Sequence, residues 1–586
     1  MGAALDTSTE SRDAASQVTI DWRLAGWGVI ALSAILFFVR LGARALWSSE
    51  FRWAGIAREM IRTGNNFWPT INGHLYYDKP LGSYWLVLAS TWVTGGLDET
   101  AARLPCAIAG LLAVGLLILM VRRLYDLRIA VIAGLILATS FSFVFFSRHA
   151  SADVETITGE LAALLLFLKY EDRPNGWWLL GLWVIMAATS LTKGLLGFVL
   201  PLMVIGLYAT LSDGWALFGE RVLHGPITER IGWLVERNRW LFNWRSVIAI
   251  AIGLAIYLIP FRISHARMGS EAGLNMVFRE NVVRFFHPFD HRGPVYLYIY
   301  VIFALMAPWS VMLPAALVQA HHARRIKSEP ARSDRFALTF FWATFIFFTV
   351  SGSRRSYYIL PILPAAAILV ARMLTSQWTQ LSVWARRLLI AGWIVFAVAT
   401  ILGGVLLVPP SAILPGLWSK LPAAPDRLIF GLMWLAAAAS ILYALARFRL
   451  DRITLSLGVT AYLSMVYIFI FAMPAAEAYR GEKPFAYQVR ELVGGQILEV
   501  WLYRTVGPLF YLDPLKPLAE FDRPKDLAAA VANGSVKWVI VRRRDLPSIG
   551  MPTEIMASEA MFPWESQYQH RNKVVLVRLG ANSHGS

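Results

Sequence analysis

The chain has 586 residues, of which 57% are hydrophobic, and a formal net charge of +17 at pH 7. Soluble domains are about 45 to 50% apolar, so this composition excludes an ordinary soluble protein and predicts a polytopic α-helical membrane protein. The positive charge lies mainly in short loops between apolar segments, and we therefore expect no nucleic acid among the partners. The single cysteine, Cys106, excludes an intrachain disulfide and a cysteine-based metal site.

The amino-terminal residues 1–23 are polar and rich in Ser and Thr, which predicts a disordered cytoplasmic tail. Residues 24–473 are predicted to form a transmembrane domain with about thirteen spans, since a span needs about 17 to 25 residues with its flanks. The expected spans are 24–39, 102–121, 129–146, 154–168, 177–191, 195–211, 247–261, 295–318, 336–350, 357–374, 388–408, 428–446 and 453–473.

The apolar segment 81–94 decides the topology. If it does not cross the membrane, the arginines of the simple loops, such as Arg122 and Arg173, all fall on one side, which the positive-inside rule makes the cytoplasm. We therefore expect 81–94 to be a juxtamembrane or re-entrant helix. The loop 44–101 then lies on the outer face of the inner membrane.

The stretch 47–84 is a long polar passage between membrane-length apolar segments. Its apolar residues, such as Trp53 and Ile56, recur at helical spacing, while Glu50 and Arg52 fall on the opposite face. This pattern predicts an amphipathic helix on the membrane surface.

Basic residues also stand on the predicted outer face, where positive charge is usually sparse. They are Arg148, Arg279, Arg284, Arg292, Arg354 and Arg355. Their position favours a bound anion, such as a phosphate near the outer leaflet.

Hydropathy falls after residue 473. The segments 499–502, 538–542 and 574–577 are typical of short strands, and 525–532 of a helix. Residues 474–586 are therefore predicted to form a small extramembrane α/β domain, on the outer side because it follows an odd number of spans.

Two acids on the outer face are candidates for chemistry. Glu50 falls in the first turn of the surface helix, where the helix dipole favours a carboxylate, and Asp153 begins a span, where it could cap that helix. Acids are costly within membrane spans, so the deeper an acid lies in the membrane, the more a functional role is favoured over a structural one. Asp153 stands at the edge, and both interpretations stay open.

A series of motifs then occurs in one order. They are SEFRWAGIAREM at 49–60, YYDKP at 76–80, an acid at Asp153, LTKG at 191–194, ENVVRF at 280–285 and SYYILP at 356–361. With thirteen spans and a trailing outer domain, the chain resembles the bacterial lipid A aminoarabinose transferases and, more loosely, the protein O-mannosyltransferases of the GT-C glycosyltransferase fold. The resemblance implies transfer of one sugar from a polyprenyl-phosphate donor to lipid A, a related glycolipid or a protein on the outer face.

The resemblance also implies roles for single residues. Glu50 is expected to act as the base, with Asp153 orienting the acceptor. Residues implied to bind the substrates are Arg52, Tyr77, Asp78, Lys79, Lys193, Arg284, Arg354 and Tyr358, of which Lys79, Arg284 and Arg354 would hold the carrier phosphate.

The chain departs from this family at two places. Ser49 stands where an Asp precedes the glutamate, so the base must be Glu50 or Asp153, unless the chain is a catalytically silent homologue that binds carrier lipid. Asn281 and Asp78 replace a histidine and a glutamate at a metal site proposed for the family. No cofactor is therefore certain, and a divalent metal at Asp78 stays an alternative.

Two further functions compete with this interpretation. An oligosaccharide ligase with a pyrophosphate-linked donor would share the fold class, and a transporter or lipid flippase would share the many spans. A transporter is expected to show repeated halves and helices interrupted at the bilayer midplane, and the sequence shows no internal repeat.

Overall fold

The structure is a computed structural model of the chain. It describes residues 20–579 except for 48, 174, 212–225, 289–290, 327–330, 409–425, 447–449, 480, 495–496, 504–508, 522, 534–535, 551 and 562–565. The predicted amino-terminal tail therefore lies almost wholly outside the described residues.

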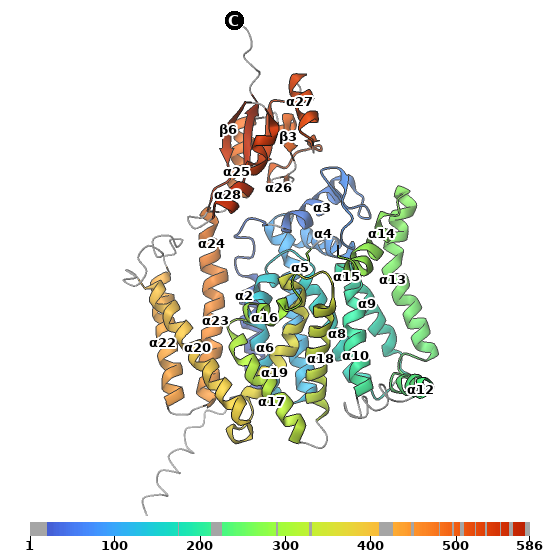
Figure 1. The fold of residues 1–586 in the computed structure, drawn as a ribbon, viewed down its shortest axis with the longest axis vertical. Helices are drawn as coiled ribbons and strands as arrows, with labels where there is room; N and C mark the ends of the chain where they lie inside the picture. Colours follow the sequence, from blue (N-terminus) through green and yellow to red (C-terminus); the bar gives the residue numbers. More distant parts are fainter. Residues whose placement is uncertain are drawn as a thin grey trace, which may run out of the picture.

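Most of the chain forms a bundle of helices, and a small domain stands at one end of it (Figure 1). The bundle helices are α2 (Trp22–Phe38), α5 (Glu99–Leu124), α6 (Leu127–Ala138), α7 (Phe141–Ser147), α8 (Asp153–Tyr170), α9 (Trp178–Lys193), α10 (Leu196–Thr210), α13 (Trp244–Met268), α16 (Leu297–Leu305), α17 (Leu313–Ile326), α18 (Arg332–Val350), α19 (Leu363–Leu374), α20 (Val383–Leu407), α22 (Arg427–Ala446) and α23 (Leu450–Val466). Six described helices are long and apolar enough to cross a membrane, or seven with one bent pair. The multi-pass membrane fold is thus confirmed, whereas the number of thirteen spans is not.

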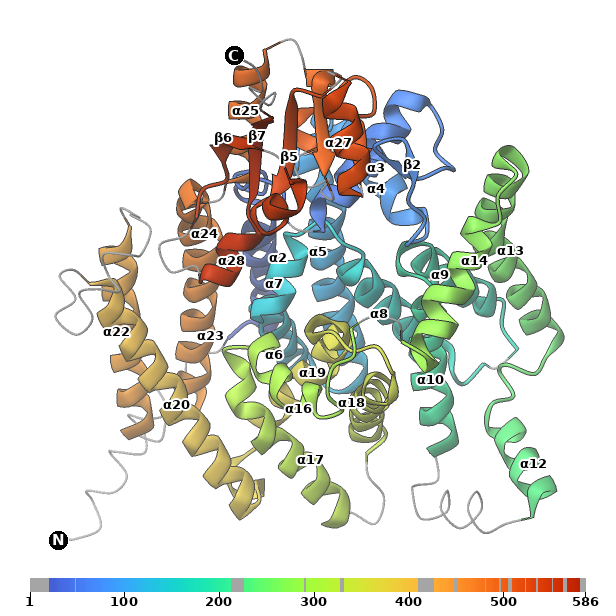
Figure 2. The same ribbon diagram turned by 45° about the horizontal axis from the view of Figure 1, so that its top comes forward.

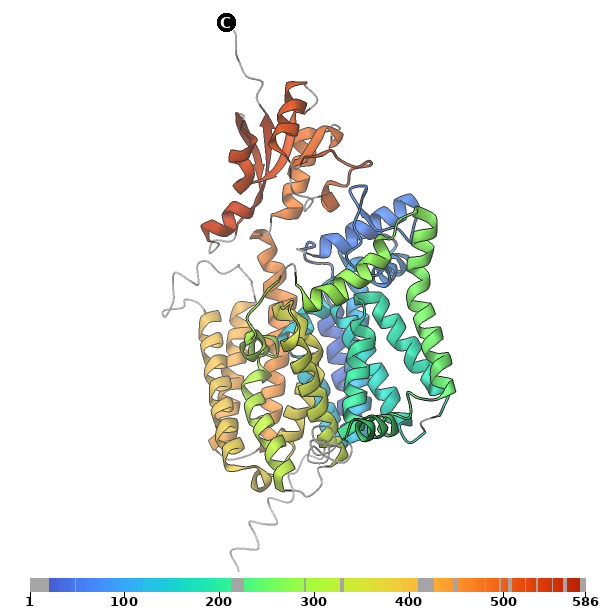
Figure 3. The same cartoon turned by 45° about the vertical axis from the view of Figure 1, so that its right-hand side comes forward.

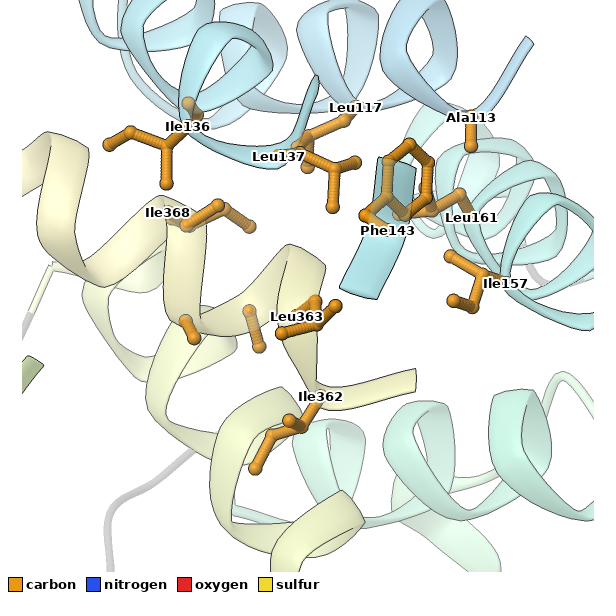
Figure 4. Close-up of a cluster of buried hydrophobic side chains, with 14 of the residues drawn as sticks. Ala113, Leu117, Ile136, Leu137, Phe143, Ile157, Leu161, Ile362, Leu363 and Ile368 are labelled. Carbon is orange, nitrogen blue, oxygen red and sulfur yellow. The ribbon is translucent and has the colours of Figure 1, made fainter. Parts of the chain in front are cut away.

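The core of the bundle forms where α5, α6, α7, α8 and α19 meet. Leu117, Leu137, Phe143, Leu161 and Leu363, one from each helix, are almost completely buried there (Figure 4). These helices are apolar on most sides because one face packs on protein and the other can face lipid.

Two predicted spans are broken. The span predicted at 129–146 consists of α6 and α7, bent by 67°, where Thr139 and Ser140 each donate a hydroxyl hydrogen bond to the backbone carbonyl four residues earlier. Such side-chain bonds compete with the helix ladder and bend helices. The span predicted at 295–318 consists of α16, the short turn Trp309–Met312 and α17, because Pro308 has no N–H to continue the helix.

Short helices lie at both ends of the bundle. At one end are α3 (Glu50–Thr63), the hairpin β1 (Thr70–Ile71) and β2 (His74–Leu75), and α4 (Gly82–Thr94), whereas α12 (Ile227–Arg237) lies at the other (Figures 1 and 3). With 13 residues, α4 is about 20 Å long, shorter than the roughly 30 Å hydrocarbon core. Its length agrees with the prediction that 81–94 does not cross the membrane.

Beyond α23, a π-helical turn (Tyr467–Ala472) and α24 (Met473–Ala475) lead into the small domain. Its five-stranded sheet has the order β4 (Glu520–Phe521), β3 (Val500–Tyr503), β5 (Trp538–Arg542), β7 (Val574–Leu579) and β6 (Thr553–Ser558), parallel from β4 to β5 and antiparallel from β5 to β6 (Figure 2). Its helices are α25 (Glu482–Val493), α26 (Leu509–Leu512), α27 (Pro524–Ala532) and α28 (Gln567–Asn572). The predicted α/β fold is confirmed, with β4 and β6 added to the three expected strands.

The small domain packs directly on α3. Trp53 and Ile56, on the apolar face of α3, are buried in one cluster with Phe485 and Leu512 of the small domain. The predicted amphipathic helix is present, but its apolar face packs on protein rather than on lipid. Fixing α3 in this way places its first turn beside the end of the bundle.

Candidate active site

A cavity of about 680 Å³ lies at this end of the bundle, and we refer to it as the chamber. Its basic lining residues are Arg52, Lys79, Lys193, Arg284 and Arg355, its acids are Asp78, Asp153 and Glu280, and Ser49, His149 and Tyr358 also line it. Charged groups are thus concentrated at the place where α3 meets the ends of the bundle helices.

An ion pair between Asp153 and Lys193 forms one wall of the chamber. Asp153 begins α8 and Lys193 ends α9, and the Lys193 ammonium donates a hydrogen bond to Asp153 Oδ1. The side chains are only 7% and 12% exposed, respectively, so each charge depends on the other for its compensation. The Lys193 Nζ also lies 5.8 Å from the centre of the Tyr358 ring.

The turn after Lys193 is fixed by Gly194 and Asn281. Gly194 has φ +103°, and a Cβ there would lie 2.5 Å from Asn281 Oδ1, so only glycine fits. The same Oδ1 accepts a hydrogen bond of 2.9 Å from the Leu195 N–H. Asn281, which replaces a histidine of the resembled family, therefore caps the first turn of α10.

Lys79 and Arg284 stand together on another side of the chamber. Arg284, which begins the short helix α15 (Arg284–Phe286), pairs with Glu280 one turn earlier. Lys79 Nζ donates to the Asp78 carbonyl at 2.8 Å, and burial lowers the pKa of Lys79, although Asp78 and Glu280 oppose the effect. An anion bound between the two cations would relieve this cost.

An apolar groove of about 290 Å³ adjoins the chamber. Its aliphatic and phenylalanine lining residues are Leu195, Leu196, Val199, Val282, Phe285, Phe286, Phe347 and Phe348. Five residues line both spaces, namely Lys79, Lys193, Glu280, Arg284 and Tyr358. Cations therefore stand at the junction of an apolar groove and a polar chamber.

Asp78 is held by Arg52 and does not form a metal site. Arg52 Nη1 donates to Asp78 Oδ2 at 3.0 Å and to the Tyr76 hydroxyl at 2.9 Å, while Asp78 Oδ1 is buried without a hydrogen-bond partner. Among the described residues, no three His, Cys, Asp or Glu side chains gather around a point. One carboxylate between Arg52 and Lys79 does not fit the donor set that a divalent cation needs.

Glu50 begins α3, as the sequence predicts, but its side chain is buried in the protein. It is 1% exposed and does not line the chamber, since Arg103 binds both of its oxygens, at 2.7 and 2.8 Å. The backbone N–H groups of Trp47 and Ala150 donate to the same carboxylate, each at 2.9 Å. Its acceptor sites are filled from inside the protein and it does not line the chamber, so direct contact between Glu50 and an acceptor stays a prediction.

Tyr77 and Arg354 also lie away from the chamber. The Tyr77 ring packs 6.1 Å from Phe261, and Arg354 donates to the carbonyls of Thr349 and Gly293. Their contacts with a substrate stay predictions, and in the structure Arg354 binds the loop that carries its neighbour. That neighbour, Arg355, lines the chamber.

The chamber nevertheless brings together most of the predicted site residues, which are Arg52, Asp78, Lys79, Asp153, Lys193, Arg284 and Tyr358. Sequence reasoning missed His149 and Glu280 as lining residues. The sequence offered one indication for each of them. His149 stands four residues before Asp153, and Glu280 stands four residues before Arg284.

A protein-family model matches part of the chain. Residues 78–228 match the family model described as dolichyl-phosphate-mannose-protein mannosyltransferase. This range includes Asp78, Asp153 and Lys193, and thus much of the chamber.

Two relatives from the curated proteins match with similar extents. An uncharacterised protein of Aquifex aeolicus is 28% identical over 348 residues, which cover 58% of this chain and 62% of the relative. The undecaprenyl phosphate-alpha-4-amino-4-deoxy-L-arabinose arabinosyl transferase of Edwardsiella ictaluri is 27% identical over 361 residues, with 60% and 59% covered. The chain thus matches about 60% of the length of these relatives.

A solved structure matches nearly the whole chain. ArnT from Cupriavidus metallidurans bound to undecaprenyl phosphate superposes with a TM-score of 0.67 at 21% identity, covering 96% of this chain and 99% of that chain. Its apo state gives a TM-score of 0.66. The chain therefore has the GT-C glycosyltransferase fold, and its predicted resemblance to the aminoarabinose and O-mannosyl transferases is confirmed.

Proposed function

We propose that the protein is a membrane glycosyltransferase that moves one sugar from a polyprenyl-phosphate donor to an acceptor on the outer face of the inner membrane. The observation that carries this proposal is the set of cations shared by the apolar groove and the polar chamber. A polyprenyl-phosphate sugar has the same order of parts, with an apolar chain, an anionic phosphate and a polar sugar.

The shared cations suit the chemistry of the leaving group. When the bond between the anomeric carbon and the phosphate oxygen breaks, negative charge grows on the polyprenyl phosphate, and fixed cations stabilise that charge. We assign this role to Arg284 and Lys79, since both line groove and chamber. Asp153 lies across the chamber, and we assign to it the orientation of the acceptor.

The acceptor is expected to enter between α3 and the small domain. A cavity of about 800 Å³ lies there, and Arg52 lines both this cavity and the chamber. Its basic lining residues are Arg52, Arg58, Arg62, Lys516 and Arg542. Glu59 and Glu520 also line it, and Asp513 pairs with Arg58 and Arg62, so the excess positive charge is carried by Arg52, Lys516 and Arg542. An excess of positive charge favours an acceptor with anionic groups, such as lipid A or a related phosphorylated glycolipid, over an uncharged protein segment.

The outer orientation rests on the arrangement of charge. The small domain and α3 lie at one end of the bundle and the arginine-bearing helix α12 at the other (Figure 1). The chamber is at the α3 end, because Arg52 and Trp53 of α3 line it. The positive-inside rule then assigns α12 to the cytoplasm and the chamber to the outer side. We accordingly keep the division into a tail at 1–23, a membrane domain at 24–473 and an outer domain at 474–586.

Transfer assays with purified full-length protein test the proposal. Donors with one phosphate and with a pyrophosphate, carrying the same sugar, are offered with lipid A, dephosphorylated lipid A or a peptide as acceptor. We expect product only from the monophosphate donor, and most with intact lipid A.

Three other results would each contradict the proposal. Product from the pyrophosphate donor alone would indicate the ligase alternative. Carrier-lipid binding without product would indicate a silent homologue, and movement of donor lipid across vesicle membranes without product would indicate a flippase.

A further inference from the structure

Glu50, His149 and Ser49 lie in a line that runs from the protein interior to the chamber. Glu50 Oε1 is 3.4 Å from His149 Nδ1, and His149 Nε2 is 3.2 Å from Ser49 Oγ. His149 and Ser49 line the chamber, whereas Glu50 does not. A buried carboxylate, an imidazole and a hydroxyl in this order form the arrangement by which enzymes of unrelated fold remove a proton from a hydroxyl group.

The imidazole is held in place by its neighbours. Its ring stacks on Phe145, with centroids 5.2 Å apart and an interplanar angle of 22°, and meets the edge of Phe146 at 6.0 Å. With Glu50 fixed by Arg103, the tautomer that these neighbours favour has its proton on Nδ1, facing the carboxylate. The Nε2 lone pair is then directed toward Ser49 and the chamber.

We propose that His149 is the catalytic base of this protein and that Glu50 is its positioning residue. The proposal rests on the glycosyl transfer described above. The acceptor oxygen bonds to the anomeric carbon, the bond from that carbon to the phosphate oxygen breaks, and its electron pair leaves with the polyprenyl phosphate. The acceptor proton passes to His149 Nε2, and the imidazolium so formed faces the Glu50 carboxylate.

Ser49 marks the place that the acceptor hydroxyl takes. Its hydroxyl lies within hydrogen-bond distance of Nε2 on the chamber wall, so an acceptor hydroxyl replacing that contact would stand where the proton can be transferred. Asp153 borders the same space, but Lys193 already binds one of its oxygens. The histidine therefore supplies a nitrogen lone pair within hydrogen-bond distance of Ser49 Oγ.

Burial keeps the His149 ring neutral when no proton has been transferred. Burial lowers its pKa below the ordinary 6.5, Glu50 and Asp153 raise it, and Arg103 and Arg44 lower it, with burial prevailing. The neutral form that accepts a proton therefore predominates at neutral pH. Transfer is expected to fall as the pH drops through the pKa of His149.

The test uses the full-length protein with a donor and an acceptor that the wild-type chain accepts. His149→Ala should lose transfer by about 10²-fold or more, because a general base is removed, while donor binding stays unchanged. Added imidazole, which can occupy the vacated space, should restore part of the rate. The matched control is His74→Ala, since His74 is exposed on β2 and should transfer at the wild-type rate.

The positioning role of Glu50 has its own readout. Glu50→Gln removes the carboxylate that raises the pKa of His149, so the acidic limb of the pH–rate profile should move to lower pH. A purely structural role would reduce the amount of active protein without moving this limb. An unmoved limb would overturn the assignment of Glu50.

Wild-type transfer by His149→Ala would overturn the proposal, as would a loss of transfer that imidazole does not restore. If this variant does not fold, His149→Gln decides the question, because it keeps a polar side chain of similar size without a basic nitrogen. Transfer by His149→Gln with the wild-type pH profile would also overturn it. A wild-type protein that transfers no sugar would refute the proposed function itself, whichever result the variants give.

Discussion

Replacing Glu50 by Gln should destabilise the folded protein strongly. The carboxylate accepts two hydrogen bonds from Arg103 and one each from the N–H groups of Trp47 and Ala150. Burial alone would raise the pKa of Glu50, but Arg103, His149 and the Ala150 N–H outweigh it and hold the pKa at about 2. Gln has nearly the same shape as Glu, but its side-chain NH₂ group replaces one of the two accepting oxygens. That NH₂ group would face N–H donors that then have no acceptor.

The size of the effect follows from the same environment. The pKa of about 2 compares with an ordinary 4.5, and at about 1.4 kcal/mol for each pKa unit the charged form is favoured by about 3 kcal/mol. Removing one partner of a buried ion pair costs about 3 to 5 kcal/mol in proteins generally. We therefore expect Glu50→Gln to lower the free energy of unfolding by about 3 kcal/mol.

The pH dependence gives a second check. Because the pKa of Glu50 is lower in the folded than in the unfolded chain, the carboxylate stabilises the fold fully above about pH 4.5. That stabilisation is lost as the pH falls toward 2, where the carboxylate takes up a proton. The difference between wild type and Glu50→Gln should therefore be constant near neutral pH and shrink below about pH 4.5.

Denaturant unfolding in detergent micelles, followed by tryptophan fluorescence, measures this difference. The control is Glu59→Gln, on the same helix, because Glu59 accepts a single backbone hydrogen bond of 3.3 Å from Gly73. We expect the control to change the unfolding free energy by less than about 0.5 kcal/mol. A Glu50→Gln protein as stable as the control at pH 7 would refute the reasoning.

Three further predictions concern the donor, the topology and the small domain. Arg284→Ala should weaken binding of the polyprenyl-phosphate donor by about 1.5 to 3 kcal/mol, with partial recovery in Arg284→Lys, and unchanged affinity would exclude a phosphate contact. Cysteines at the exposed positions His74 and Asn533 should react with an impermeant thiol reagent in intact cells, and one at Arg122 only after lysis; the reverse pattern would invert the topology. Asp513→Ala should speed hydrogen exchange in α3, since Asp513 accepts from two arginines of that helix, and unchanged exchange would show that these ion pairs do not hold it.

The sequence predicted elements best where one local pattern determined them. The apolar spacing from Trp53 to Met60 specified α3. The loop charges predicted that 81–94 does not cross the membrane, and the length of α4 agrees with that prediction. The burial of the Glu50 side chain was not predictable in this way. Its partner Arg103 is 53 residues away on α5, and a helical wheel does not show which neighbouring helix covers its first turn.

The site was predicted in its composition more than in its geometry. Arg354 and Arg355 are adjacent, and side chains alternate in extended backbone such as that at Arg355, with φ −113° and ψ 153°. The residue at which the extended segment starts therefore determines which of the two arginines faces the chamber. Residue types alone do not specify that starting residue. Lys79 and Arg284 both line the chamber, and each belongs to a recognised motif, YYDKP at 76–80 and ENVVRF at 280–285.

The two substrates meet different parts of the fold. Of the residues assigned to the donor phosphate, Lys79 lies in the loop before α4 and Arg284 begins α15. Ser49 is the N-cap residue of α3, and Arg52 lies in the first turn of that helix. Because the small domain and Arg103 hold α3 from two sides, a change at that domain reaches the acceptor side through one rigid helix. Substitutions between the small domain and α3 should therefore alter acceptor use while leaving donor affinity unchanged.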